Sequence, residues 1–112
     1  MMTTTRERLP QRRASITFTF ELDGFSYAAT AGFYPDGRIG EVFLGAAKDG
    51  TSLSIATRDS AIALSFALQH GCRLATIRDA MTRDEAGNPQ GALGALVDLL
   101  CQHEAEMMGG AE

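Results

Sequence analysis

The chain has 112 residues, a formal net charge of −4 and an apolar fraction of 45%, which is typical of a single globular domain. No apolar run approaches the length that spans a bilayer, and the polar, Thr-rich start lacks the apolar stretch of a signal peptide. The two cysteines are too few for a disulfide framework. We therefore expect a cytoplasmic protein that does not contact a membrane.

Positive charge is concentrated at the start of the chain. Four arginines and one glutamate lie within the first 13 residues, whereas acidic residues outnumber basic ones in the rest. Residues 1–13 are therefore predicted to form a flexible basic arm. Such an arm can bind nucleic acid or an acidic protein surface, or it can be a solvated tail that binds nothing.

Three segments show the period-two alternation of half-buried strands. In residues 15–22 the apolar side chains occupy every second position, and residues 25–33 and 38–44 continue the pattern. Asp23-Gly24 is a strong hairpin signal, and Pro35-Asp36-Gly37 indicates a second turn. The pattern predicts an antiparallel meander of three strands.

The second half of the chain has the signals of three helices. After a small-residue loop at 46–50, Thr51 or Ser52 is expected to cap a helix that ends near Gln69 or His70, with Gly71 as its stop. The centre of this helix, residues 61–68, is apolar on nearly every side, which predicts burial all round or a place in an interface.

A short helix over 74–81, a polar loop over 82–89 and a third helix from about 90 to 108 follow, and 109–112 is expected to be a frayed tail. Strands followed by helices, rather than alternating with them, indicate an α+β fold. We expect a three-stranded antiparallel meander with three helices packed on the sheet, and residues 14–108 as a single domain.

Two histidines and two cysteines raise the question of a metal site. His70, Cys72, Cys101 and His103 together have the composition of a zinc site. Their spacing is poor, because Cys101 and His103 would point about 200° apart on a helix. The sequence therefore predicts no metal ligation, a fold that forms without metal, and two ordinary thiols.

Motifs of nucleophile elbows, phosphate loops and dinucleotide-binding turns are missing from the sequence, so we assign no catalytic residues and no cofactor. Arg58-Asp59, near the start of the main helix, is either a ligand-binding pair or a solvated one. The candidate binding residues are Arg8, Arg12, Arg13, Arg38, Arg58 and Asp59.

Several short motifs, taken in order, resemble a known domain. They are Arg8-Leu9-Pro10-Gln11-Arg12-Arg13 leading into Thr17-Phe18, Pro35-Asp36-Gly37-Arg38 with Glu41-Val42-Phe43-Leu44, Arg58-Asp59, Leu68-Gln69-His70-Gly71, Thr76-Ile77-Arg78 and Gly91-Ala92-Leu93-Gly94. From about Arg6 to Leu100 the chain resembles the TSCPD domain, found at the C-terminus of adenosylcobalamin-dependent ribonucleotide reductases and in small free-standing proteins. The segment that names the family contains a cysteine, and residues 88–92 at the corresponding place do not.

The resemblance implies a non-catalytic accessory domain in DNA precursor metabolism. It would act through protein contacts, with nucleotide contacts as an open alternative, and a reductase subunit would be its partner. The cobalamin site and radical-site cysteines of those enzymes lie outside the resembling region, so any reductase label would be inherited from the family. The alternative function is a stand-alone protein that binds a small ligand or nucleic acid through the basic arm.

The number of apolar side chains also predicts self-association. The sheet and the main helix carry more of them than so small a monomer is expected to bury. We therefore expect a homo-oligomer, most simply a two-fold dimer. The alternative is that a reductase subunit docks on the exposed apolar surface and that the chain alone is monomeric.

Overall fold

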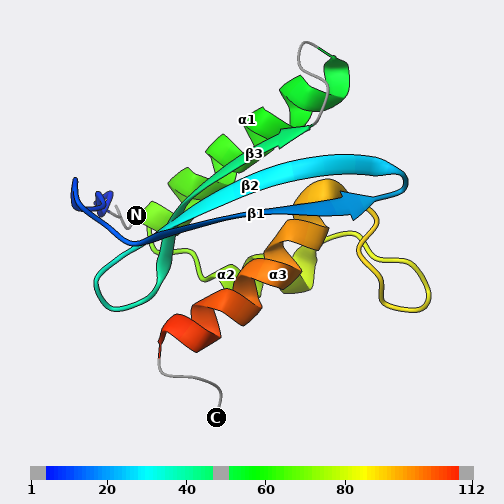
Figure 1. Ribbon diagram of the computed structural model, residues 1–112. Coiled ribbons are helices and arrows are strands. Elements are labelled where there is room, and N and C mark those ends of the chain that lie inside the picture. Colours follow the sequence, from blue (N-terminus) through cyan, green and yellow to red (C-terminus); the bar gives the residue numbers. More distant parts are fainter. Residues whose placement is uncertain (1–4, 47–50, 109–112) are drawn as a thin grey trace.

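The computed structural model describes residues 5–46 and 51–108. Strands β1 (Ser15–Leu22), β2 (Phe25–Phe33) and β3 (Ile39–Ala46) form an antiparallel sheet in the order β1-β2-β3. Helices α1 (Ser52–Gln69), α2 (Leu74–Ala80) and α3 (Ala92–Met107) follow, as Figure 1 shows. The predicted α+β fold is confirmed. The first residues of the arm, most of the 46–50 loop and the expected frayed tail lie outside the described residues.

The hairpin between β1 and β2 forms where Asp23-Gly24 predicts it. Asp23 and Gly24 have φ angles of 53° and 81°, the left-handed pair that a two-residue type I′ turn requires. Leu22 is therefore paired with Phe25, and the register continues along the strand to Ser15 opposite Gly32. This register places the apolar positions of both strands on the same face.

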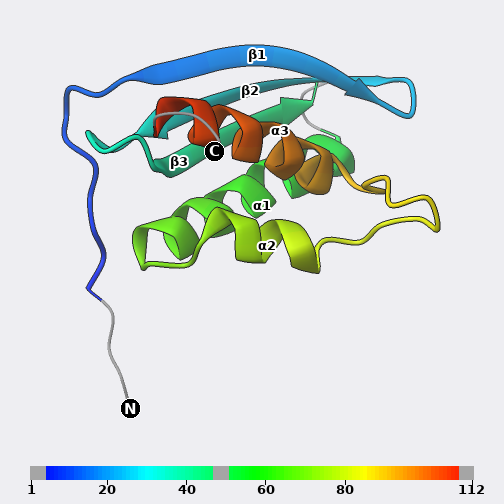
Figure 2. The same ribbon diagram turned by 90° about the horizontal axis from the view of Figure 1, so that it is seen from below.

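The helices lie on one side of the sheet (Figure 2). Helix α1 packs along β3, while α3 contacts β2 and α2 packs against α3. Between the sheet and the helices lies one core of buried apolar side chains: Tyr27, Ala29, Ala31, Phe33, Ile39, Val42, Leu44, Ala61, Leu64, Leu68, Leu74, Leu96, Val97 and Leu100. In the described ranges no helix has the length and apolarity needed to cross a membrane.

Some element ends differ from the prediction. Helix α3 begins at Ala92 rather than 90, because Pro89 is held in an isolated bridge with Arg83 and Gly91 is extended at φ −115° and ψ 161°. Strand β3 begins at Ile39 because the carbonyl of Arg38 closes the preceding turn by accepting from the amide of Tyr34 at 2.8 Å. Helix α2 ends at Ala80, since Met81 has extended backbone angles.

Helix α1 has a buried and an exposed face. Thr51 caps its start and accepts a hydrogen bond from the amide of Ser54 at 3.1 Å. The opposite face exposes Ile55, Ile62 and Phe66 by 52%, 48% and 46%. The prediction that this helix is buried on all sides is therefore wrong for a single copy of the chain. The alternative prediction, that it lies in an interface, stays a prediction.

Candidate functional site

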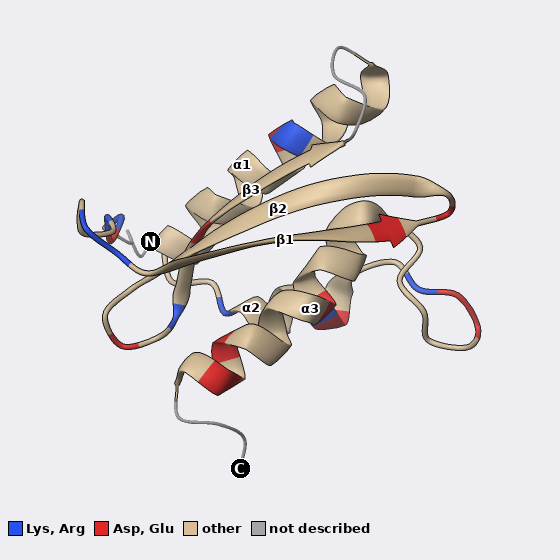
Figure 3. Cartoon of the chain, in the orientation of Figure 1, with Lys and Arg blue, Asp and Glu red and all other residues tan. Residues whose placement is uncertain are grey.

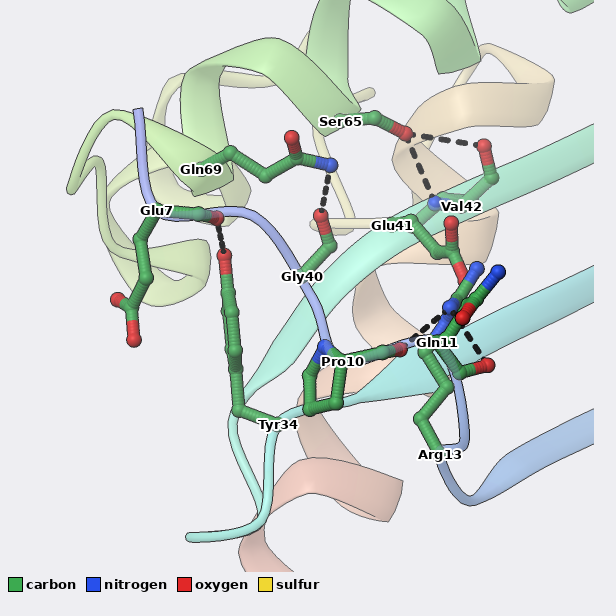
Figure 4. A network of polar contacts seen from close by, with 10 residues as sticks. All are labelled: Glu7, Pro10, Gln11, Arg13, Tyr34, Gly40, Glu41, Val42, Ser65 and Gln69. Carbon is green, nitrogen blue, oxygen red and sulfur yellow. Dashed lines mark hydrogen bonds and ion pairs between the residues drawn. The ribbon is translucent and has the colours of Figure 1, made fainter. Parts of the chain in front are cut away.

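The described part of the basic arm, residues 5–13, lies across the end of α1 and the start of β3. The amide of Glu7 donates to the carbonyl of Gln69 at 2.7 Å, and the Glu7 carbonyl accepts a hydrogen bond from the hydroxyl of Tyr34 (Figure 4). Both backbone polar groups of Glu7, the amide and the carbonyl, are thus hydrogen-bonded to distant parts of the fold. These contacts favour a docked arm over the flexible one expected from composition, and amide exchange will decide between the two.

Gln69, at the end of α1, connects three segments. Its side chain is 5% exposed. The amide nitrogen donates to the carbonyl of Gly40 at 2.8 Å, and the amide oxygen accepts from the guanidinium of Arg6. The Arg6 guanidinium also lies 4.6 Å from the ring centroid of Phe66, a cation–π distance. A single buried amide therefore ties helix, strand and arm together.

Tyr34 forms the floor beneath the arm. Its ring lies against Gly40, where an added Cβ would come within 2.5 Å of a ring carbon, so only glycine leaves room for it. Arg38 stacks over the ring at 4.6 Å. Burial, followed by the nearby Glu7 carboxylate, raises the pKa of Tyr34. The hydroxyl thus stays protonated and remains a donor to the arm.

Arg13 fixes the point where the arm enters β1. It forms an ion pair with Glu41 on β3 and donates to the carbonyls of Pro10 at 2.6 Å and Gln11 at 3.3 Å (Figure 4). Arg38 makes a second ion pair with the arm, 3.1 Å from Glu7. Both arginines therefore serve partly to hold the arm in place.

The same arm presents two exposed arginines to solvent. Arg8 and Arg12 are exposed, and neither forms a salt bridge within residues 5–46 and 51–108. We call the surface made by Arg6, Arg8, Arg12, Arg13 and Arg38 the arm face. Its five arginines meet three carboxylates, Glu7, Asp36 and Glu41, so the arm face keeps an excess of positive charge.

Not every predicted binding residue belongs to this surface. On the arm face, Arg13 lines one surface hollow with Arg8 and another with Arg12, and Arg38 pairs with Glu7 of the arm. Arg58 and Asp59 lie instead on the exposed side of α1. Figure 3 shows the charged patch of α1 apart from the basic arm. Arg58 instead borders a largely apolar hollow of about 460 Å³ between α1 and β3, with Phe43 and Ile62 in its lining.

The four candidate metal ligands are dispersed. His70 follows the end of α1 and Cys72 is exposed before α2. His103 packs on the ring of Phe18 at 5.3 Å, and burial raises the pKa of the Cys101 thiol. Across the described part of the chain, no group of three or more possible ligands is close enough to hold a metal ion.

Sequence reasoning missed the residues that hold the arm. The sequence does not predict that Glu7, Tyr34, Gly40 and Gln69 hold the arm, because each contact joins segments far apart in the chain. A single clue was present: Gln69 ends a largely apolar helix, and a polar residue that is buried needs a partner.

Comparison with curated proteins finds relatives that share a segment with this chain. The vitamin B12-dependent ribonucleotide reductase of Rhodopirellula baltica is 42% identical over 72 residues, 64% of this chain and 7% of that enzyme. The enzyme of the same name from Streptantibioticus cattleyicolor is 42% identical over 71 residues, 63% of this chain and 12% of the relative. That from Bradyrhizobium diazoefficiens is 38% identical over 77 residues, 69% of this chain and 6% of the relative.

The chain therefore corresponds to a small part of much larger relatives. It is homologous to a segment of vitamin B12-dependent ribonucleotide reductases, and the match spans 7%, 12% and 6% of the length of these three relatives. No family model matches the chain. No solved structure matches it either.

Proposed function

We propose that this chain is a non-catalytic accessory domain that docks on a vitamin B12-dependent ribonucleotide reductase. The observation that carries the proposal is the 42% identity over 72 residues to a segment that makes up only 7% of such an enzyme. We infer that the shared segment is a module of those enzymes with a fold of its own. The finer assignment, to the TSCPD module at the reductase C-terminus, rests on the motifs quoted above.

The arm face is the surface we assign to docking. Arg8 and Arg12 offer guanidinium donors that pair with no carboxylate of residues 5–46 and 51–108, and guanidinium groups bind carboxylates in a two-point geometry. The contacts of Glu7 to Gln69 and Tyr34 hold the arm against the body of the domain. A positioned row of cations fits an acidic protein surface better than a mobile tail would, because less conformational entropy is lost on binding.

Binding to a truncated reductase tests this proposal. The purified chain is mixed with a vitamin B12-dependent reductase from which the similar segment has been removed, and association is measured by calorimetry. We expect binding that weakens by about tenfold or more in the Arg8→Glu, Arg12→Glu double variant. Arg73→Glu, an exposed charge reversal at the start of α2, serves as the control and should bind normally.

Two results would overturn the proposal. One is the lack of any association with the truncated enzyme, and the other is equal binding by the arm variant and the wild type.

The alternative function, nucleic-acid binding through the arm, has a different signature. Affinity for DNA or RNA would fall steeply with salt, and the truncated reductase would not compete.

A further inference from the structure

The two edges of the sheet are treated differently by the fold. Along β3, the side chain of Ser65 on α1 accepts from the amide of Val42 at 2.8 Å and lies 3.1 Å from its carbonyl oxygen. The side-chain amide of Gln69 donates a hydrogen bond to the carbonyl of Gly40. Side chains of α1 thus satisfy the outward backbone groups at these positions, and a further strand cannot pair there.

The edge formed by β1 is open. The amide of Phe33 donates to the carbonyl of Ala14 at 2.9 Å, and antiparallel pairs alternate between bonded and non-bonded. Together with the register, this directs the backbone groups of every second residue of β1 away from β2. These residues are Ser15, Thr17, Thr19 and Glu21. Within residues 5–46 and 51–108 β1 is an edge strand of the sheet and pairs with β2 alone, while the helices lie on one face of the sheet (Figure 2).

This edge also lacks the features that prevent pairing. Edge strands are commonly protected by proline, lysine, a bulge or short length. The eight residues of β1 contain neither proline nor lysine, and the register with β2 runs without a shift. The strand is therefore able to accept another strand along its whole length.

The inner face of β1 is incompletely covered. Ile16, Phe18, Phe20 and Leu22 are partly buried and form the border of the core. Phe18 contacts His103 of α3 at 5.3 Å, and Phe20 stacks on Tyr27 at the same ring separation. A neighbouring sheet with a similar inner face would complete the burial of these side chains, which is favourable because it removes apolar surface from water.

The charge along β1 is complementary to itself. Arg12 and Arg13 precede the strand, whereas Glu21 and Asp23 lie at its other end. Two copies that run antiparallel place the basic end of one beside the acidic end of the other. A two-fold axis produces this arrangement and closes the assembly at two subunits.

We propose that a second copy of this chain pairs with the β1 edge and makes a continuous six-stranded sheet. With Phe18 on the two-fold axis, Ser15 lies opposite Glu21 of the partner subunit and Thr17 opposite the partner's Thr19. This register uses all four outward-facing residues and forms about eight hydrogen bonds. It brings Arg13 opposite Asp23 of the partner subunit and places the two Phe18 rings side by side.

Light scattering coupled to size exclusion tests the assembly at micromolar concentration. We expect twice the chain mass of 12.0 kDa, and a mass of one chain would overturn the proposal. Glu21→Lys places like charge beside the partner's basic end, so the dissociation constant should rise by about tenfold. Glu85→Lys, an exposed loop variant, should leave it unchanged.

Disulfide formation tests the register independently of stability. Thr17→Cys and Thr19→Cys are prepared separately in a chain that carries Cys72→Ser and Cys101→Ala. Bonded antiparallel pairs have Cα atoms about 5.5 Å apart, within the disulfide range. Mild oxidation should link the two variants when they are mixed and neither one alone. If a dimer forms but gives no mixed disulfide, and Glu21→Lys leaves its dissociation constant unchanged, the dimer uses another surface and the proposal is contradicted.

Discussion

At the scale of single residues, polar side chains join the elements of this fold. Ser65 and Gln69 lie on a helix whose sequence is otherwise largely apolar, and both bond to the backbone of β3. Among the described residues, no buried side-chain polar atom lacks a hydrogen-bond partner. The cost of removing one of these bonds is therefore the cost of leaving a buried backbone group unpaired.

Ser65→Ala should destabilise the domain by about 1–3 kcal/mol, because the amide of buried Val42 loses its acceptor. Urea denaturation followed by circular dichroism measures the free energy of unfolding. Ser60→Ala is the matched control, since the Ser60 hydroxyl donates within its own helix, to the carbonyl of Thr57 at 2.9 Å. Equal effects of the two substitutions would show that the bond across to β3 does not matter.

The pair of Arg83 and Asp98 predicts how stability depends on pH. Two hydrogen bonds of 2.9 and 2.7 Å join the guanidinium to the carboxylate, and they lower the pKa of Asp98. Because the pKa of Asp98 is lower in the folded chain than in the unfolded one, ionised Asp98 stabilises the fold at any pH above its unfolded-state pKa. This stabilisation is lost as the pH falls through the pKa of Asp98 in the folded state.

Asp98→Asn should therefore reduce the unfolding free energy at neutral pH and match the wild type at acidic pH. Denaturation across the acidic range checks this. Glu85→Gln, in the exposed loop, provides the comparison and should leave the profile unchanged. A constant difference between Asp98→Asn and wild type at all pH values would contradict the assigned linkage.

At the scale of elements, the sequence predicts features set by local signals, such as strand bounds and turns, better than contacts between distant segments. The bounds of β1 and β2 follow from the alternation and from Asp23-Gly24, whose turn geometry sets the register. The predicted start of α3 at about residue 90 is wrong, because the bridge between Arg83 and Pro89 extends the preceding loop and the helix begins at Ala92. The arm contacts were not predictable, because composition reports charge and not the location of a buried acceptor such as the Gln69 carbonyl.

Amide hydrogen exchange decides whether the arm is docked. The amide of Glu7 should exchange slowly, because it donates to Gln69 at 2.7 Å. Gly40→Ala should accelerate it, since the new methyl group would displace Tyr34 from beneath the arm. Gly45→Ala is the control, because a Cβ there meets no atom within 4 Å. Rapid exchange of Glu7 in the wild type would support the flexible arm.

At the scale of the whole molecule, the fold separates its surfaces. The helices cover one face of the sheet, α1 closes the β3 edge, and the arm face occupies the end where the arm crosses α1 and β3. The open β1 edge and the arm face share Arg12 and Arg13 at the start of β1, whereas Arg6, Arg8 and Arg38 of the arm face lie outside the proposed strand pairing. The cytoplasmic location and the lack of a cofactor remain predictions.

The most direct test of the central claim is a residue-level map of the contact with the reductase. The backbone amide signals of the labelled chain are recorded by nuclear magnetic resonance before and after addition of the truncated reductase. We predict that the signals of residues 6–13 and of Arg38 shift or broaden first. Changes confined to the exposed side of α1 around Ile55 and Ile62, or no changes at all, would contradict docking through the arm face.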